Sequence, residues 1–240
     1  YIQGVGIGTL TDAMTAVKYH VFDRQTVPMQ TLLEALDADF DGHQPLEKQL
    51  SKSPRYGNDD DCADAVAVDV FNMYYDVLNG RPNTKGGRYR VNLLPTTVHI
   101  YFGQVTGALP NGRRAGLPLS DGISPSQGTD TQGPTAVIKS ASKIDHARTG
   151  GTLLNMKFNP QVLEGEAIEK LVHLIRGYFR LDGHHIQFNV VNRETLIEAQ
   201  KNPHQHRDLI VRVAGYSDYF VELGPDLQNE IISRTEQKAL

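Results

Sequence analysis

The sequence has very little cysteine: Cys62 is the only one in 240 residues, and there is no tryptophan. A single cysteine excludes an internal disulfide framework and is typical of a reducing compartment. No apolar run approaches the roughly 20 residues that a membrane-spanning helix needs, so we expect no membrane association. The net charge of -4 gives no basic excess and argues against nucleic-acid binding.

What the chain does contain is ordinary for a soluble globular protein. Hydrophobic residues make up 39% and charged residues 22% of the sequence, and 240 residues can bury a substantial core as one or two domains. The sequence begins at Tyr1, without methionine, inside a Gly-rich apolar stretch. We therefore expect it to be part of a longer protein.

Segments with helical periodicity alternate with β-rich segments, which predicts an α/β fold. Thr11 or Asp12 is expected to cap the first helix. Asn58 is expected to cap a long helix whose first turn holds Asp59, Asp60 and Asp61. Further helices are predicted over 29–40, 163–180, 193–201 and 226–238. Strands are predicted over 96–102, 134–140, 152–158, 185–191 and 209–213.

The loop after the last predicted strand is the most informative stretch. Leu209–Val213 has the composition of a buried strand, and Gly215 follows it, where loops often carry functional residues. Taken alone, Gly215-Tyr216 is typical of an ordinary turn, because the chain has 22 glycines and loops collect them. Its neighbours change that interpretation.

Arg212-Val213-Ala214-Gly215-Tyr216-Ser217, followed by Phe220 and by 231–235, resembles the C-terminal signature of the glycyl radical enzymes. The resemblance runs from 4–10 to the chain end. It includes 56–60 and 107–118. The tracts 133–140 and 182–189 resemble the dehydratase and carbon–nitrogen lyase members more than pyruvate formate-lyase.

By this resemblance, Gly215 stores the radical, and Arg212, Val213, Ala214, Tyr216 and Ser217 support its loop. Glycine suits that role because it has no Cβ to crowd a planar Cα radical. Tyr216 and Phe220 are expected to pack the loop into the core. The resemblance implies no bound cofactor. A partner, a 4Fe-4S, S-adenosylmethionine-dependent activating enzyme, installs the glycyl radical.

The implied fold is a ten-stranded α/β barrel with surrounding helices and a central radical loop, shielded from water and oxygen. This chain is its C-terminal part. We expect a helical segment over 1–90, barrel strands and helices over 91–204, and the glycyl radical domain over 205–240. Half a barrel exposes apolar faces and strand edges, so poor solubility is expected in isolation.

The family also needs a cysteine that takes over the radical. Cys62 lies between Asp61 and Ala63 in an acidic helix start, where carboxylates disfavour a thiolate. Catalytic cysteines of the family resemble Gly-Cys-X-Glu on a loop. We therefore expect the catalytic cysteine and glutamate upstream of Tyr1.

Other motifs receive structural interpretations. The acidic run from Asp59 lacks the spacing of a calcium loop. The basic turn 111–116 is expected to be structural, and His184-His185 would point to opposite faces of a strand, so no metal site is predicted. On the predicted strand 96–102 and the residues before it, Leu94, Thr96 and Val98 would share one face and are the substrate-pocket candidates; simple core packing is the alternative.

The resemblance implies a radical dehydratase or lyase that eliminates water or an amine from a small hydroxylated substrate. The alternatives are a pyruvate formate-lyase-type acyltransferase, a non-catalytic spare-part radical subunit, and a generic α/β binding domain. The expected partners are the activating enzyme, a small-molecule substrate and, in the full-length enzyme, a second copy in a homodimer. The expected location is the cytoplasm, or a microcompartment, of an anaerobic bacterium or archaeon.

Overall fold

The computed structural model of the chain describes residues 1–165 and 167–239. Its α-helices are α1 Ile7–Val17, α2 Met29–Asp37, α3 Gln44–Leu50, α4 Asp61–Leu78, α5 Val98–Gln104, α6 Pro134–Ser142, α7 Ala167–Arg180, α8 Arg193–Lys201 and α9 Pro225–Ser233. Its strands are β1 Ile2–Gln3, β2 Val91–Asn92, β3 Leu154–Phe158, β4 Ile186–Val190, β5 Ile210–Arg212, β6 Ser217–Tyr219 and β7 Glu236–Gln237. This mixture confirms the predicted α/β class.

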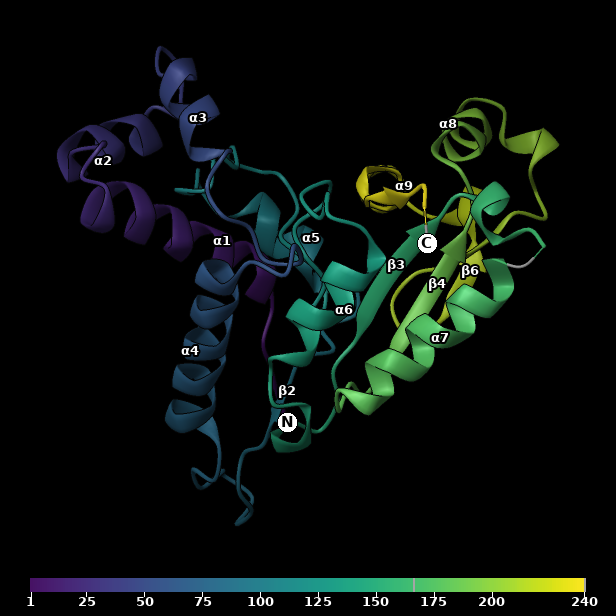
Figure 1. Cartoon of the computed structure of the whole chain (residues 1–240), viewed down its shortest axis with the longest axis horizontal. Coiled ribbons are helices and arrows are strands. Elements are labelled where there is room, and N and C mark those ends of the chain that lie inside the picture. Colours follow the sequence, from purple (N-terminus) through teal and green to yellow (C-terminus); the bar gives the residue numbers. More distant parts are fainter. Residues whose placement is uncertain (166, 240) are drawn as a thin grey trace.

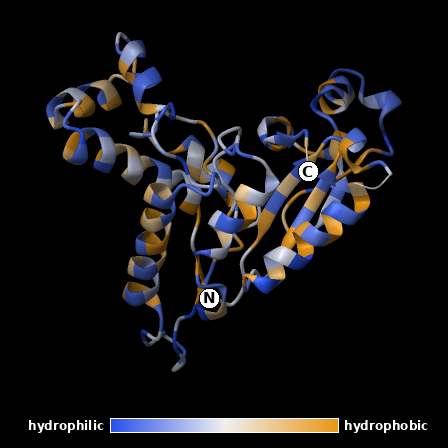
Figure 2. Ribbon diagram, in the orientation of Figure 1, coloured by the Kyte–Doolittle hydropathy of each residue, from blue (hydrophilic) through white to orange (hydrophobic). Residues whose placement is uncertain are grey.

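The central sheet has the strand order β4-β3-β7, and both pairs are parallel. In the β3–β4 register, Asn155 lies opposite Gln187 and Lys157 lies opposite Asn189. Parallel partners point to the same side of a sheet, so these four polar side chains share one face. Figure 2 shows the resulting alternation of hydrophobic and hydrophilic residues along β3 and β4.

The apolar face of this sheet forms part of the largest core. Leu154, Met156 and Phe158 pack there with Tyr178 of α7 and Val137 of α6. In Figure 1, α7 lies along one side of β3 and β4, while α9 lies on the other side. The polar face of the sheet therefore contacts the C-terminal segment, which contains β5 and α9.

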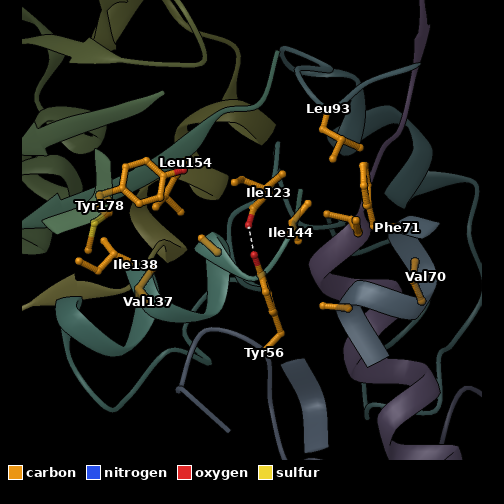
Figure 3. Packing of buried hydrophobic residues seen from close by; sticks show 14 of the residues in the cluster. Tyr56, Val70, Phe71, Leu93, Ile123, Val137, Ile138, Ile144, Leu154 and Tyr178 are labelled. Carbon is orange, nitrogen blue, oxygen red and sulfur yellow. Dashed lines mark hydrogen bonds between the residues drawn. The ribbon is translucent and has the colours of Figure 1, made fainter. Parts of the chain in front are cut away.

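The same core extends to the helical part of the chain. Figure 3 shows Tyr56 between the side chains packed on the sheet, such as Tyr178, and those of the helical part, such as Phe71. The Tyr56 hydroxyl donates to the Ile123 carbonyl at 2.9 Å. Tyr56 is fully buried among apolar side chains, and burial raises the pKa of its hydroxyl well above the ordinary value. This bond satisfies a polar group that would otherwise be costly to bury.

The first helix begins earlier than predicted. It starts at Ile7, directly after Gly6 with φ +77°, and continues as the π-helical stretch Lys18–Asp23. The predicted cap at Thr11 or Asp12 is therefore wrong. Asp12 lies inside α1, fully buried, and its carboxylate accepts from Arg55 and from the Tyr56 N–H.

The cap of α4 is also shifted. Asp60, rather than Asn58, is the N-cap, and its side chain accepts from the Cys62 and Ala63 amides. Asn58 instead holds another loop, because its Oδ1 accepts from the amides of Thr131 and Gln132. Four consecutive residues of cap-forming type, 58–61, made the sequence ambiguous at this point.

Two predicted strands are helices. The segment 96–102 contributes to α5, and 134–140 to α6. Thr96 has φ +53°, which ends the extended run before α5 begins. Pro134 occupies the first turn of α6, a position that proline favours and that predicts a helix start. Local β-propensity was overridden in both segments.

The C-terminal predictions need correction as well. The strand expected over 209–213 is present as β5, but it is buried on one face only, with Val211 buried and Ile210 59% exposed. Helix α9 ends at Ser233, and the following Glu236–Gln237 pairs with β3 as β7. The strands predicted over 152–158 and 185–191 and the helix over 193–201 are confirmed by β3, β4 and α8.

Among the described residues, no helix is both long and apolar enough to cross a membrane. The division into 1–90, 91–204 and 205–240 stays a prediction.

Candidate functional site

Gly215 lies in the tight turn of a β-hairpin. Strands β5 and β6 pair antiparallel, with Arg212 opposite Ser217, and the Val213 N–H donates to the Tyr216 carbonyl at 2.9 Å. Ala214 and Gly215 form the connection, and Gly215 has φ +79°. An L-residue at this left-handed position costs about 1–2 kcal/mol, so the turn itself favours glycine.

The hairpin is buried on one side only. Val213 and Ala214 belong to the apolar cluster formed with Leu196 of α8 and Ile231 of α9. Gly215 is exposed, and apart from Gly215 and its two chain neighbours no heavy atom of the described chain lies within 4 Å of the position that an added Cβ would occupy. The described residues therefore do not supply the shielding expected around a radical position.

The two aromatic residues behave differently. Phe220 is fully buried in the same apolar cluster, as expected. Tyr216 is 40% exposed, so the prediction that it packs the loop into the core is wrong. The inward-facing side chains of the hairpin are those of Val211 in β5 and of Val213 and Ala214 at the start of the turn.

A buried glutamine of β4 holds the turn from inside. The Oε1 of Gln187 accepts from the Gly215 N–H at 3.1 Å and from Nε of Arg212 at 3.0 Å. Its Nε2 donates to the Val213 carbonyl at 3.3 Å. One side chain thus contacts the backbone on both sides of Ala214.

Asn189, two residues further along β4, holds β5. Its Nδ2 donates to the Arg212 carbonyl and its Oδ1 accepts from the Arg212 N–H, both at 2.7 Å. Both amide side chains come from the polar face of the sheet and are buried. The hairpin is therefore bound to β4 through side chains.

Helix α9 closes the hairpin from the other side. Arg234 forms an ion pair with Glu230 at 2.8 Å, and its Nη1 donates to the Val213 carbonyl at 3.1 Å. Burial alone would raise the pKa of Glu230. The Arg234 charge, with the His99 imidazole 3.5 Å from Oε1, outweighs burial and holds that pKa well below its usual range. The ion pair is thus fully charged and desolvated.

Lys157 of β3 supports the end of α9. Its Nζ donates to the carbonyls of Ile231 and Ile232 at 3.2 and 3.0 Å, and the side chain is almost completely buried. Burial lowers the pKa of the Lys157 amine to about 8. The amine meets carbonyls at a helix C-terminus, which carries partial negative charge.

Sequence reasoning missed Gln187, Asn189, Asn155 and Lys157. The available signal was the regular insertion of polar residues at every second position of 154–158 and 186–190. In a strand this alternation places them on one face. What the pattern lacked was any indication that this polar face is buried.

The substrate-pocket candidates do not share a strand face. Leu94 is half-buried and packs against the apolar cluster that includes Val213 and Ala214. Thr96 is exposed and Val98 begins α5. The geometric basis of the prediction is wrong, and the role of these residues in a pocket stays a prediction.

The basic turn 111–116 is held by the protein's own groups. The Arg113 guanidinium is buried and donates to the carbonyls of Gly103, Thr106, Gly107, Leu117 and Pro118. Arg114 pairs with Glu47 and Asp41. These contacts support the structural interpretation. The turn borders a groove of about 450 Å³ beside α9.

The acidic residues at the start of α4 are also accounted for within the chain. Asp59 pairs with Lys139 and Lys143, and the largest cause lowering its pKa is the hydrogen bond from Lys139. Lys143 also pairs with Asp64. Within the described residues, no group of three or more His, Cys, Asp or Glu side chains is arranged to hold a metal ion.

Comparisons with known proteins address the whole chain. Residues 1–103 match the family model described as pyruvate formate lyase-like, and residues 119–221 match the model described as glycine radical. The second match contains the Gly215 hairpin. The chain belongs to the glycyl radical enzyme family.

Individual relatives agree over nearly the full chain. The trans-4-hydroxy-L-proline dehydratase of Clostridioides difficile is 59% identical over 239 residues, which is 99% of this chain and 30% of that protein. The isethionate sulfite-lyase of Desulfovibrio desulfuricans is 44% identical over 100% of this chain and 30% of its own.

Among solved structures, the glycerol-bound B12-independent glycerol dehydratase of Clostridium butyricum has a TM-score of 0.95 and 44% identity. The match covers 98% of this chain and 30% of that one. The chain thus spans about 30% of the length of the relatives it matches. It corresponds to one part of the family's fold.

Proposed function

We propose that this chain is the C-terminal part of a radical lyase in which Gly215 stores an unpaired electron while a small hydroxylated substrate loses water. One observation carries the proposal. Gly215 occupies the left-handed position of a hairpin turn within the segment that matches the glycine radical model, and its N–H is held by Gln187. The hairpin and α9 fall within 205–240, the proposed glycyl radical domain.

Loss of one hydrogen atom from the Gly215 Cα leaves an electron shared between the amide nitrogen and the carbonyl group. The proposed partner for this step is an activating enzyme that uses a 4Fe-4S cluster and S-adenosylmethionine. The open space beside the Gly215 Cα is the side from which a partner can approach. In the resting enzyme, we propose, the rest of the full-length protein covers this side.

The proposed relay cysteine is not Cys62. Cys62 lies in the first turn of α4, and Figure 1 shows α4 and the β5–β6 hairpin on opposite sides of the molecule. We therefore place the cysteine and its glutamate partner elsewhere in the full-length protein. A homodimer located in the cytoplasm or a microcompartment remains part of the proposal.

The relatives suggest which substrates to test first. The 59% identical relative is named for trans-4-hydroxy-L-proline, whereas those at 44% identity are named for isethionate and glycerol. Hydroxyproline dehydration is therefore the first reaction to examine. Leu94, which packs beside the hairpin cluster, is the pocket candidate nearest to the proposed radical site by its contacts.

The test uses the full-length protein, activated without oxygen by its activating enzyme. The expected result is a doublet in the electron paramagnetic resonance spectrum and consumption of trans-4-hydroxy-L-proline, with glycerol, isethionate and pyruvate as parallel substrates. Turnover of pyruvate with coenzyme A alone would favour the acyltransferase alternative. Absence of the doublet after activation with an enzyme proven on a related protein would overturn the proposal.

A further inference from the structure

Gln187 has only one amide orientation that satisfies its surroundings. Its Oε1 faces two donors, the Gly215 N–H and Nε of Arg212. Its Nε2 faces two acceptors, the Val213 carbonyl and Oδ1 of Asn155. Rotating the amide by 180° would oppose donors to donors and acceptors to acceptors, so the orientation is fixed by the network.

The network continues to a buried carboxylate. Asn155 accepts from Gln187 through its Oδ1 and donates through its Nδ2 to Oδ2 of Asp121. The Asn155 N–H donates to Oγ of Ser124 at 3.0 Å, which fixes the strand at this point. Asp121, Asn155 and Gln187 are each at least nine-tenths buried. The hydrogen bonds therefore run in one direction, from the Gly215 N–H to the Asp121 carboxylate.

Aligned hydrogen bonds polarise one another, more strongly in a low-dielectric interior. Because Asn155 donates to the Asp121 carboxylate, the Asn155 Oδ1 becomes a stronger acceptor for Gln187 Nε2. The bond to Asn155 in turn makes Gln187 Oε1 a stronger acceptor. A stronger acceptor at the Gly215 N–H increases the electron density on that nitrogen. A Cα radical beside an amide nitrogen is stabilised by electron donation from this nitrogen.

We propose that Gln187 is a positioning residue for the Gly215 radical, because its side-chain oxygen fixes the Ala214–Gly215 peptide plane and, with Asn155 and Asp121 behind it, polarises the Gly215 amide. This inference rests on the proposed function and extends it to a second residue. The N–H of Gly215 is directed toward the sheet, while the side of Cα that an added Cβ would occupy stays open. Gly215 is thus held on its N–H side by Gln187 and is accessible to a partner on the opposite side of its Cα.

The chain offers a matched control for this role. Asn189 lies on the same strand and face as Gln187, is equally buried, and makes two hydrogen bonds to the hairpin. Its bonds go to the backbone of Arg212 and not to Gly215. Loss of Asn189 therefore weakens the attachment of the hairpin without removing the acceptor at the Gly215 amide.

The experiment compares wild type, Gln187→Met and Asn189→Leu in the activated full-length protein labelled with [15N]glycine. The readout is the hyperfine coupling of the radical to its amide nitrogen and exchangeable amide proton, together with spins per chain. We expect Gln187→Met to change both couplings and to lower the spin yield about fivefold, the effect of one ordinary hydrogen bond. We expect Asn189→Leu to leave both couplings at the wild-type values.

The outcomes separate the two proposals. If the wild type gives no radical, the proposed function fails. If the wild type gives a radical and Gln187→Met leaves the couplings unchanged, or if both variants change them equally, the positioning role is overturned and the proposed function stands. Should Gln187→Met not fold, Gln187→Asn keeps the amide but is one methylene too short to reach Gly215, and the same two outcomes apply.

Discussion

Arg234 and Glu230 form a buried ion pair one helical turn apart, and the arginine also donates to the carbonyl of Val213, two residues before Gly215. The side chains are 7% and 0% exposed. The pair therefore links the end of α9 to the proposed radical loop through groups that have lost their hydration. Its integrity should control both the stability of the domain and the position of the loop.

Removing one member of this pair should be severely destabilising. Arg234→Met leaves the Glu230 carboxylate buried without its main counter-charge, which typically costs about 3–5 kcal/mol. The double variant Glu230→Leu with Arg234→Met should recover a large part of that loss, because neither charge of this pair stays buried. Free energies of unfolding from urea titrations measure both.

The control for this prediction is Arg114→Met, which removes a partly exposed pair with Glu47. Surface pairs typically contribute less than about 1 kcal/mol. A loss for Arg234→Met no greater than that of the control would contradict the buried-pair interpretation.

Gly215→Ala should abolish the radical without preventing folding. The added Cβ meets no heavy atom of the described chain beyond the two neighbouring residues, so the cost is limited to the left-handed backbone, about 1–2 kcal/mol. Gly42→Ala is the matched control, because Gly42 also has φ +79° and equally open surroundings. Both variants should lose similar stability in thermal unfolding, and only Gly215→Ala should lose the doublet. A doublet that persists in Gly215→Ala would place the radical elsewhere.

Stability should rise with pH above 8 because of Lys157. Its folded pKa is about 8, against an ordinary value of 10.5, so the unfolded chain binds more protons between these values. The free energy of unfolding should therefore increase from pH 8 to pH 10, by up to about 2 kcal/mol. A neutral amine still has two N–H groups for the two carbonyls it contacts.

Urea unfolding at pH 7.5, 8.5 and 9.5 tests this, with Lys157→Met as the comparison. In Lys157→Met, the free energy of unfolding should no longer show the increase with pH that the Lys157 amine causes. Equal slopes for the two proteins would show that Lys157 does not carry the effect. Measurements stop at pH 10, since burial raises the pKa of Tyr74 to about 12 and buried tyrosines of this kind lower stability at higher pH.

Air should cut the activated protein at Gly215. The position is exposed within this chain, so any movement that uncovers it in the full-length protein admits oxygen. Mass spectrometry after activation and exposure should show a new C-terminal peptide that begins next to Gly215. Protein that was never activated, and activated Gly215→Ala, should stay intact. Full-length mass retained by the activated wild type would count against a radical at this residue.

The Gly215 backbone amide was found from the sequence, whereas its partner, the Gln187 side-chain amide, was not. The signature Arg212–Ser217 pointed to Gly215 because glycine chemistry and motif spacing are local properties of the chain. Gln187 lies 28 positions earlier, and its contact with Gly215 exists only after β4, β5 and α9 have packed together. No periodicity in the sequence encodes which polar strand face will be buried.

The segments that were predicted wrongly have the same explanation. The residues 96–102 have strand-like composition, but a left-handed Thr96 ends the extended run and the segment enters α5. The residues after Ser233 are good helix formers such as Glu236, Gln237 and Lys238, yet Glu236 and Gln237 leave the helix to pair with β3. At Glu236–Gln237 a partner strand distant in sequence decided the local conformation.

The sequence by itself determined the α/β class, the position of the glycine and the family signature, because these depend on residue type and spacing along the chain. The tertiary structure decided that the polar face of the β3–β4 sheet is buried, that Gln187 holds the Gly215 amide, and that Gly215 is open to one side. These properties depend on which surfaces meet, and hydrogen bonds between distant residues are fixed only when packing removes the water that would otherwise satisfy them.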